Sequence, residues 1–129
     1  MAEQIVIYFT LITTTIVIQA FSNKIMDSVS SILRDKYSTR TVLLVLLLYI
    51  TFLTLLIDIL LWASVIYLLG IYGEFRLAMA YAIDSFSTLG GKNLPPPWEL
   101  LGPTIALNGI VIIAFGATYM FSTLYPEKS

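Results

Sequence analysis

The chain contains no cysteine and no histidine among its 129 residues. This excludes disulfide bonds, iron–sulfur clusters, zinc sites of the Cys/His type, and copper or haem held by histidine. Cysteine nucleophiles and histidine acid–base catalysis are excluded for the same reason. We therefore expect no enzyme activity and no resident cofactor.

Charged residues are also scarce, at 12% of the chain, about half of the roughly 25% typical of soluble domains. Hydrophobic residues make up 58%, and the mean hydropathy is +0.89. The net charge of -1 provides no basic surface for nucleic acid, so no nucleic-acid partner is expected. The composition predicts an integral membrane protein, with the lipid bilayer as its first partner.

Three segments are long and apolar enough to cross a bilayer, which needs about 20 residues. They are Gln4–Phe21, Thr41–Gly70 and Leu101–Leu124. The second would be roughly 45 Å long as a helix and would exceed a ~30 Å hydrocarbon core, so we expect it to tilt or protrude. No basic residue precedes Lys24, so the first segment lacks a signal-peptide pattern and is expected to be kept.

The connection FSNKIMDSVSSILRDKYSTR, between the first two spans, has helical periodicity. Its predicted apolar face carries Phe21, Ile25, Val29, Ile32 and Leu33, and the opposite face carries Lys24, Asp27, Ser31 and Arg34. We interpret it as a helix that continues out of the membrane and lies on its surface. A helix that docks on a partner is the alternative.

Four of the seven basic residues fall in this connection: Lys24, Arg34, Lys36 and Arg40. Cytoplasmic loops of membrane proteins carry an excess of Lys and Arg, so the connection is expected in the cytoplasm. The N-terminus then lies outside, residues 72–99 lie on the outer side, and the C-terminus lies in the cytoplasm.

The region between the second and third spans has an unusual order of segments. EFRLAMAYAIDSF, at 74–86, predicts a short helix, because its apolar residues recur three and four apart. FSTLGGKN follows with two adjacent glycines, and then the proline-rich KNLPPPWELLG. Such an order is typical of a re-entrant loop, whose carbonyl groups, repeated around an axis, can replace the hydration shell of a cation.

This arrangement resembles the two-helix pore module of the tetrameric potassium-channel superfamily, and most closely its short bacterial members, described as ion-channel or two-pore-type potassium-channel family proteins. The motifs that carry the resemblance are WA at 62–63, STLGG at 87–91, PPPWELLG at 95–102 and NGIVIIAFG at 108–116. It implies an all-α membrane protein with three transmembrane helices and a re-entrant pore helix and filter loop between the second and third. A homotetramer in a prokaryotic inner (plasma) membrane is also implied.

The expected organisation has two parts. Residues 1–40 form an N-terminal transmembrane helix and a cytoplasmic amphipathic segment. Residues 41–129 form the pore module, with outer helix 41–71, pore helix 74–86, filter-like loop 87–97 and inner helix 101–125. The function implied by the resemblance is passive conduction of a monovalent cation.

The filter itself departs from the family pattern Thr-Thr-Leu/Val-Gly-Tyr-Gly-Asp. Ser87 stands for the first Thr, Gly91 for Tyr, Lys92 for the second Gly and Asn93 for Asp. By resemblance, Thr88 gives a hydroxyl ring, Leu89, Gly90 and Gly91 give lining carbonyls, and Lys92 and Asn93 form the mouth. Because four lysines at the mouth would repel cations, only weak selectivity is expected. The alternative is a non-conducting, channel-like structural subunit of a larger membrane complex.

Asp84, Ser87 and Trp98 are candidates for supporting the filter. Asp84 lies four residues before Thr88, where a bacterial potassium channel has a glutamate paired with the filter aspartate. We expect Asp84 to pair with Lys92 or Asn93, which would compensate a buried charge. The alternative is a local hydrogen bond to Ser85, Ser87 or the backbone.

Two further groups of residues are candidates. Asp58 lies mid-span on a face with Thr51, Thr54 and Trp62, where an ionisable residue marks a functional site by default. It is either a proton- or cation-sensing group, or, as we favour, a protonated or hydrogen-bonded carboxyl that fixes the packing of the first span through Thr10 or Thr14. On the last span, Gly109 and Gly116 share a face for packing or as a hinge, and Asn108 is a candidate for a cross-subunit hydrogen bond.

Overall fold

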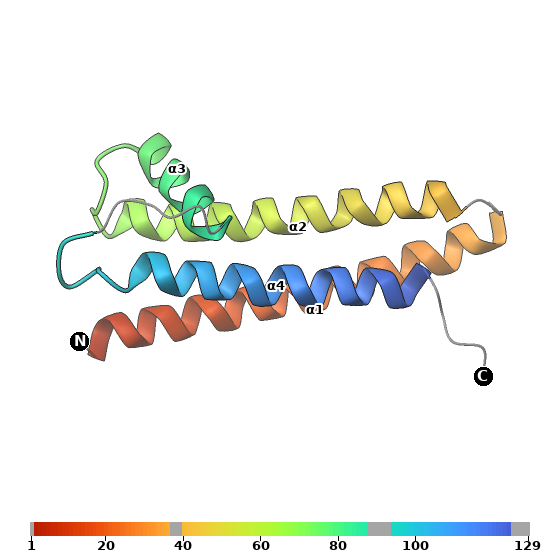
Figure 1. The fold of residues 1–129 in the computed structure, drawn as a ribbon, viewed down its shortest axis with the longest axis horizontal. Helices are drawn as coiled ribbons and strands as arrows, with labels where there is room; N and C mark the ends of the chain where they lie inside the picture. The colour runs from red at the N-terminus through yellow and green to blue at the C-terminus, as the bar shows by residue number, and fades with distance from the viewer. Residues whose placement is uncertain (1, 37–39, 88–93, 125–129) are drawn as a thin grey trace.

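The computed structural model describes residues 2–36, 40–87 and 94–124, and these form four helices and no strand. They are α1 (Ala2–Lys36), α2 (Arg40–Leu68), α3 (Phe75–Phe86) and α4 (Leu101–Leu124). The three long helices lie side by side in alternating directions, and α3 lies at one end (Figure 1). All three are long and apolar enough to cross a membrane, as the sequence predicted.

The bundle carries its large apolar side chains on the outside. Phe9, Leu107 and Phe115 are each more than 60% exposed, whereas Thr15, Ser22 and Asn108 are buried. Because lipid chains are as apolar as leucine, helices in a membrane associate through close packing and polar contacts and not through burial of apolar groups. This distribution is compatible with an integral membrane protein.

Helix α1 is continuous and does not divide into a span and a separate segment. Residues 22–33 stay within the bundle, where Met26 packs against Leu43 and Leu47 of α2. Phe21, Ile25 and Ile32 of the predicted apolar face are exposed in the single chain, and Ser22, Met26 and Ser30 are buried. An apolar face that protein does not cover suits contact with lipid, so the location of this segment at the membrane surface stays a prediction.

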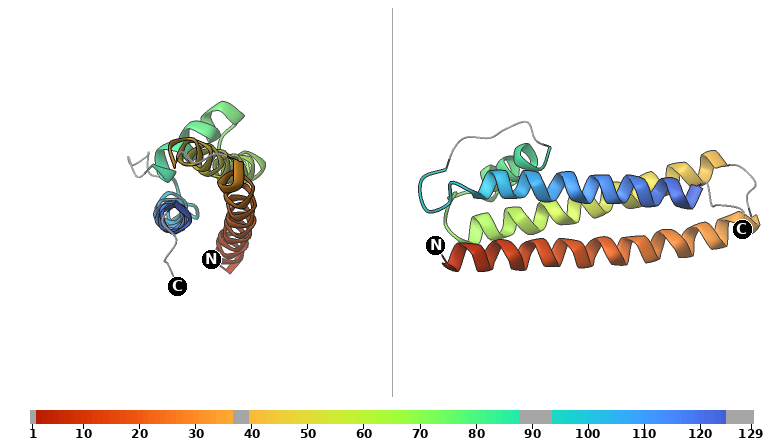
Figure 2. Two further views of the ribbon diagram at one scale, coloured as in Figure 1. Left: turned by 90° about the vertical axis from the view of Figure 1, so that its right-hand side faces the viewer. Right: turned by 60° about the horizontal axis from the view of Figure 1, so that its bottom comes forward.

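Seen end-on, the three long helices occupy the corners of a triangle, and α3 lies beside α2 (Figure 2). The N-terminus, the end of α2 and the start of α4 lie together at the end that carries α3, and the start of α2 and the end of α4 lie at the other (Figure 1). Helix α2 ends at Leu68, and the turn that follows contains Gly70, whose φ of +74° suits glycine. The chain then turns back into α3, which packs against both α2 and α4.

Candidate functional site

The candidate site is the place where α3 meets α2 and α4. Residue Glu74 is extended and precedes the helix without a side-chain cap. The buried face of α3 consists of Ala78, Tyr81, Ala82, Ser85 and Phe86. The two alanines bring α3 close to α2, where Trp62, Ala63 and Ile66 are fully buried in the same cluster. The WA motif therefore lies in the contact between α2 and α3.

The C-terminal end of α3 lies against Gly109 of α4. A Cβ atom at position 109 would lie 2.7 Å from the backbone oxygen of Phe86 and 3.2 Å from its ring. Because a backbone oxygen cannot move aside as a flexible side chain can, this contact is a packing reason for glycine at 109. Gly109 is eight residues after the start of α4, so the end of α3 lies about 12 Å along that helix.

A second close contact joins α3 to the first turn of α4. A Cβ atom at Gly102 would lie 2.6 Å from the hydroxyl oxygen of Tyr81. Tyr81 is buried, and burial is the main cause that raises the pKa of its hydroxyl, which therefore stays neutral. Sequence reasoning did not select Gly102 or Tyr81, although Gly102 and Gly109 are seven residues apart and so share a helix face.

Gly116 extends the same seven-residue spacing but has other neighbours. A Cβ atom there would lie 3.6 Å from the side-chain nitrogen of Gln19 and 3.8 Å from Thr51, which are ordinary contacts. Gly116 thus lies where α1, α2 and α4 meet and has room for a methyl group. The sequence suggested one common role for Gly109 and Gly116, but the two glycines lie against different helices.

The filter-like residues Thr88, Leu89, Gly90, Gly91, Lys92 and Asn93 lie outside the described residues. The predicted pairing of Asp84 with Lys92 or Asn93 lies outside them as well. Asp84 is exposed in the single chain, and the Ser87 hydroxyl donates to its backbone carbonyl at 3.2 Å. Trp98 is half-buried and packs against the cluster around α3.

Asn108 makes its hydrogen bond within the chain. The Thr15 hydroxyl of α1 lies 3.1 Å from the Asn108 side-chain oxygen and 2.8 Å from the Ile12 carbonyl, and its single proton goes to one of them at a time. Both side chains are buried. This bond joins α1 to α4 within the chain. The side-chain nitrogen of Asn108 has no hydrogen-bond partner among the described residues, so the cross-subunit bond stays a prediction.

Two further polar contacts hold α1 in the bundle, and sequence reasoning did not select them. The hydroxyl of Thr54 lies 2.8 Å from that of Ser22, and the Tyr119 hydroxyl donates to the Asp27 carboxylate. The sequence did contain a signal for the polar face of α1, because Thr15 and Ser22 are seven residues apart and so share a helix face.

Asp58 is fully buried, and neither of its carboxylate oxygens has a hydrogen-bond partner among the described residues. The threonines expected to bind it do not do so. The hydroxyl of Thr10 donates to the Val6 carbonyl at 2.8 Å, and that of Thr14 donates to the Thr10 carbonyl at 2.7 Å. The packing role through these threonines is wrong, because in an apolar helix the nearest acceptor of a hydroxyl is its own backbone.

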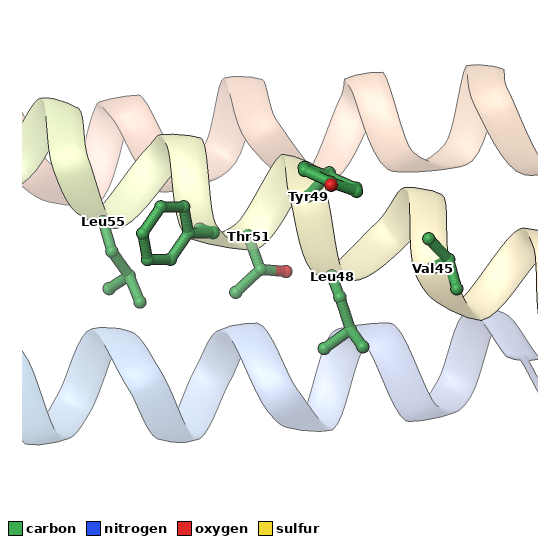
Figure 3. A pocket seen from close by; sticks show the side chains of 6 residues that line it. Val45, Leu48, Tyr49, Thr51 and Leu55 are labelled. Atoms are coloured by element: carbon green, nitrogen blue, oxygen red, sulfur yellow. The ribbon is translucent and has the colours of Figure 1, made fainter.

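An apolar groove of about 440 Å³ lies on the half of α2 distant from α3, on the side of α2 that includes Leu48 and Leu55 (Figure 3). Its lining residues are Val45, Leu48, Tyr49, Thr51, Phe52 and Leu55. The Thr51 hydroxyl donates to the Leu47 carbonyl at 2.9 Å. A groove with so few free polar groups is unsuited to an ion.

Among the described residues, no group of three or more Asp and Glu side chains is placed to hold a metal ion. Comparisons of the chain with protein-family models, curated proteins and solved structures give no match.

Proposed function

We propose that the chain is the subunit of a homotetrameric cation channel with a non-standard, weakly selective filter at 87–97. The observation that carries the proposal is the contact of Phe86 with Gly109. It sets the end of α3 about 12 Å along a helix long enough to span the membrane. If α4 spans the bilayer, this level lies within the membrane, which supports α3 as a re-entrant pore helix.

The direction of α3 favours a cation over an anion. Its C-terminal end is directed toward the middle of the bundle (Figure 1), and the C-terminus of a helix carries roughly half a negative charge. Four such ends around an axis would stabilise a cation in the low-dielectric interior. Irregular backbone at that depth is tolerated where protein buries it or where it lines a water-filled cavity.

Helix α4 would serve as the inner helix of this pore. Its buried face, with Ile105, Asn108, Gly109 and Ile112, packs within the subunit. The other face remains for neighbouring subunits and the pore, and it includes Leu107, Ile110, Ala114 and Thr118, all exposed in the single chain. An apolar lining of this kind restricts ion passage when it loses its water.

The membrane orientation follows from charge. The end of the bundle opposite α3 carries Lys36 and Arg40, and cytoplasmic ends are rich in basic residues. The α3 end and the N-terminus then lie outside, and the C-terminus lies in the cytoplasm.

The test combines particle mass with ion flux. The detergent-solubilised protein is expected to have a protein mass of four times 14.4 kDa, and liposomes that contain it are expected to take up a monovalent cation. A single copy bound to unrelated subunits would instead identify the chain as a non-conducting structural subunit. The departure of the upper filter from the family pattern is the reason to consider this alternative. A tetramer that carries no flux contradicts conduction.

A further inference from the structure

The level of Asp58 along the bundle can be inferred from two hydrogen bonds that α1 makes to other helices. Thr54, four residues earlier on α2, is bonded to Ser22 of α1, and Thr15 of α1 is bonded to Asn108. Since α1 and α2 run in opposite directions, Asp58 lies between the levels of these two bonds, about 6 Å from the first and about 4–5 Å from the second along the axis. Its carboxyl is thus in the interior of the bundle, near the depth at which α3 ends.

No charge of the described residues compensates this carboxyl. Its two oxygens have no hydrogen-bond partner in the part of the chain that the structure describes, and α4 carries no charged residue between Leu101 and Leu124. On α1, Asp27 accepts the Tyr119 hydroxyl, and the Lys24 ammonium lies over the Phe21 ring, 6.0 Å from its centroid. On α3, Arg76 is exposed and pairs with Glu74 at 3.3 Å.

Two ligands would remove the charge of a buried carboxylate: a metal cation or a proton. A hard cation such as calcium needs six to eight oxygen ligands, and no acidic cluster of the described residues offers them. An ionised and unpaired carboxylate is costly in an apolar interior, and such a group takes up a proton instead. The negative C-terminal end of α3 at a similar depth disfavours the ionised form further.

We propose that Asp58 is a proton-binding site inside the membrane. The carboxyl holds one proton at neutral pH, and the neutral acid allows α1 and α2 to pack around it as they do in the structure. This inference does not depend on ion conduction, because it concerns only the packing within one chain.

The test is infrared spectroscopy of the protein in lipid at neutral pH. The carbonyl band of a protonated carboxyl is expected in the wild type, with a shift in heavy water, and is expected to be absent from the Asp58→Asn variant. The control is Asp84→Asn, whose exposed carboxylate should contribute carboxylate bands only. If Asp58→Asn removes carboxylate bands and leaves the protonated-carboxyl region unchanged, the proposal is overturned.

Thermal unfolding gives a second readout. Asparagine is neutral and has nearly the shape of a protonated aspartic acid, so Asp58→Asn is expected to change the Tm by no more than about 3 °C. A loss well beyond that would indicate an ionised and paired carboxylate and would overturn the proposal. If the variant does not fold, wild-type protein labelled with carbon-13 in its aspartates gives a readout without a substitution, since Asp27 and Asp84 are exposed and Asp58 is buried.

Discussion

The backbone carbonyl oxygen of Phe86 lies so close to Gly109 that a Cβ atom at position 109 would be 2.7 Å away. This contact fixes the end of α3 against the middle third of α4. The level along α4 at which α3 ends therefore depends on the absence of a side chain at one position.

Gly109→Ala is expected to separate α3 from α4 and to lower the free energy of unfolding by about 1–3 kcal/mol, as overpacking of an interior does. The measurement is unfolding in detergent, followed by circular dichroism. Gly116→Ala is the matched control. It places the same methyl group in ordinary contact distance of Gln19 and should be neutral or stabilising by up to about 1 kcal/mol, because alanine favours a helix over glycine. Equal losses in the two variants would contradict the packing role of Gly109.

The Thr15–Asn108 bond is expected to couple α1 to α4. Thr15→Val leaves the buried side-chain oxygen of Asn108 without a donor, at a cost of about 1–3 kcal/mol. A double-mutant cycle with Asn108→Leu should give a coupling of about 0.6 kcal/mol, with an upper bound near 1.7 kcal/mol. The control is Thr14→Val, because the Thr14 hydroxyl bonds to its own helix. A coupling of zero would show that the bond does not hold the two helices together.

Cysteines at Ser22 and Thr54 are expected to form a disulfide under mild oxidation. Their hydroxyl oxygens are 2.8 Å apart, which brings the Cβ atoms near the separation a disulfide requires. The chain has no other cysteine, so a mass-tagged maleimide counts the remaining thiols without background. The control pairs Ser22→Cys with Phe52→Cys, whose side chain is exposed on α2 and should stay reduced. If both thiols of the Ser22→Cys, Thr54→Cys variant stay free, the contact between α1 and α2 at these residues is contradicted.

The membrane orientation predicts which thiols an impermeant reagent reaches in intact cells. A single cysteine that replaces Asn93 should be labelled in intact cells. A single cysteine that replaces Ser31, which is exposed near the C-terminal end of α1, should be labelled only after lysis. The physical reason is the excess of basic residues in the connection at 24–40, which in the proposed orientation lies in the cytoplasm. The opposite pattern would reverse the orientation.

Lys92 is expected to limit cation entry into the pore of the proposed tetramer. At about 4 Å and an effective dielectric constant near 20, Asp84 and Lys92 would attract by roughly 4 kcal/mol before desolvation is subtracted. Lys92→Gly should therefore raise cation flux into liposomes, and Asp84→Asn should lower it by freeing four positive charges. If Asp84→Asn conducts as well as the wild type, Asp84 does not compensate Lys92.

The helices were largely predictable because their signals are local. Twenty or more apolar residues in a row predict a span wherever they occur, and the predicted 41–71, 74–86 and 101–125 correspond to α2, α3 and α4 within three residues at each end. The first 40 residues were less well predicted. Their polar residues predict an exit from the membrane, which stays a prediction, and they gave no sign that Ser22 and Asp27 make contacts between helices.

The sequence by itself determined the three helices long and apolar enough to span a membrane, the short helix between the last two and the absence of Cys/His chemistry, because these depend on composition and local periodicity. Only the tertiary structure decided which face of each helix is internal, since apolar residues in a bilayer gain little by turning toward protein. The tertiary structure alone also distinguished the roles of two glycines: Gly109 lies against Phe86, whereas Gly116 has room for a methyl group. It also left Asp58 without a partner among the described residues, because a carboxyl meets a hydrogen-bond donor, an acceptor or a cation only if the packing of other helices brings one there.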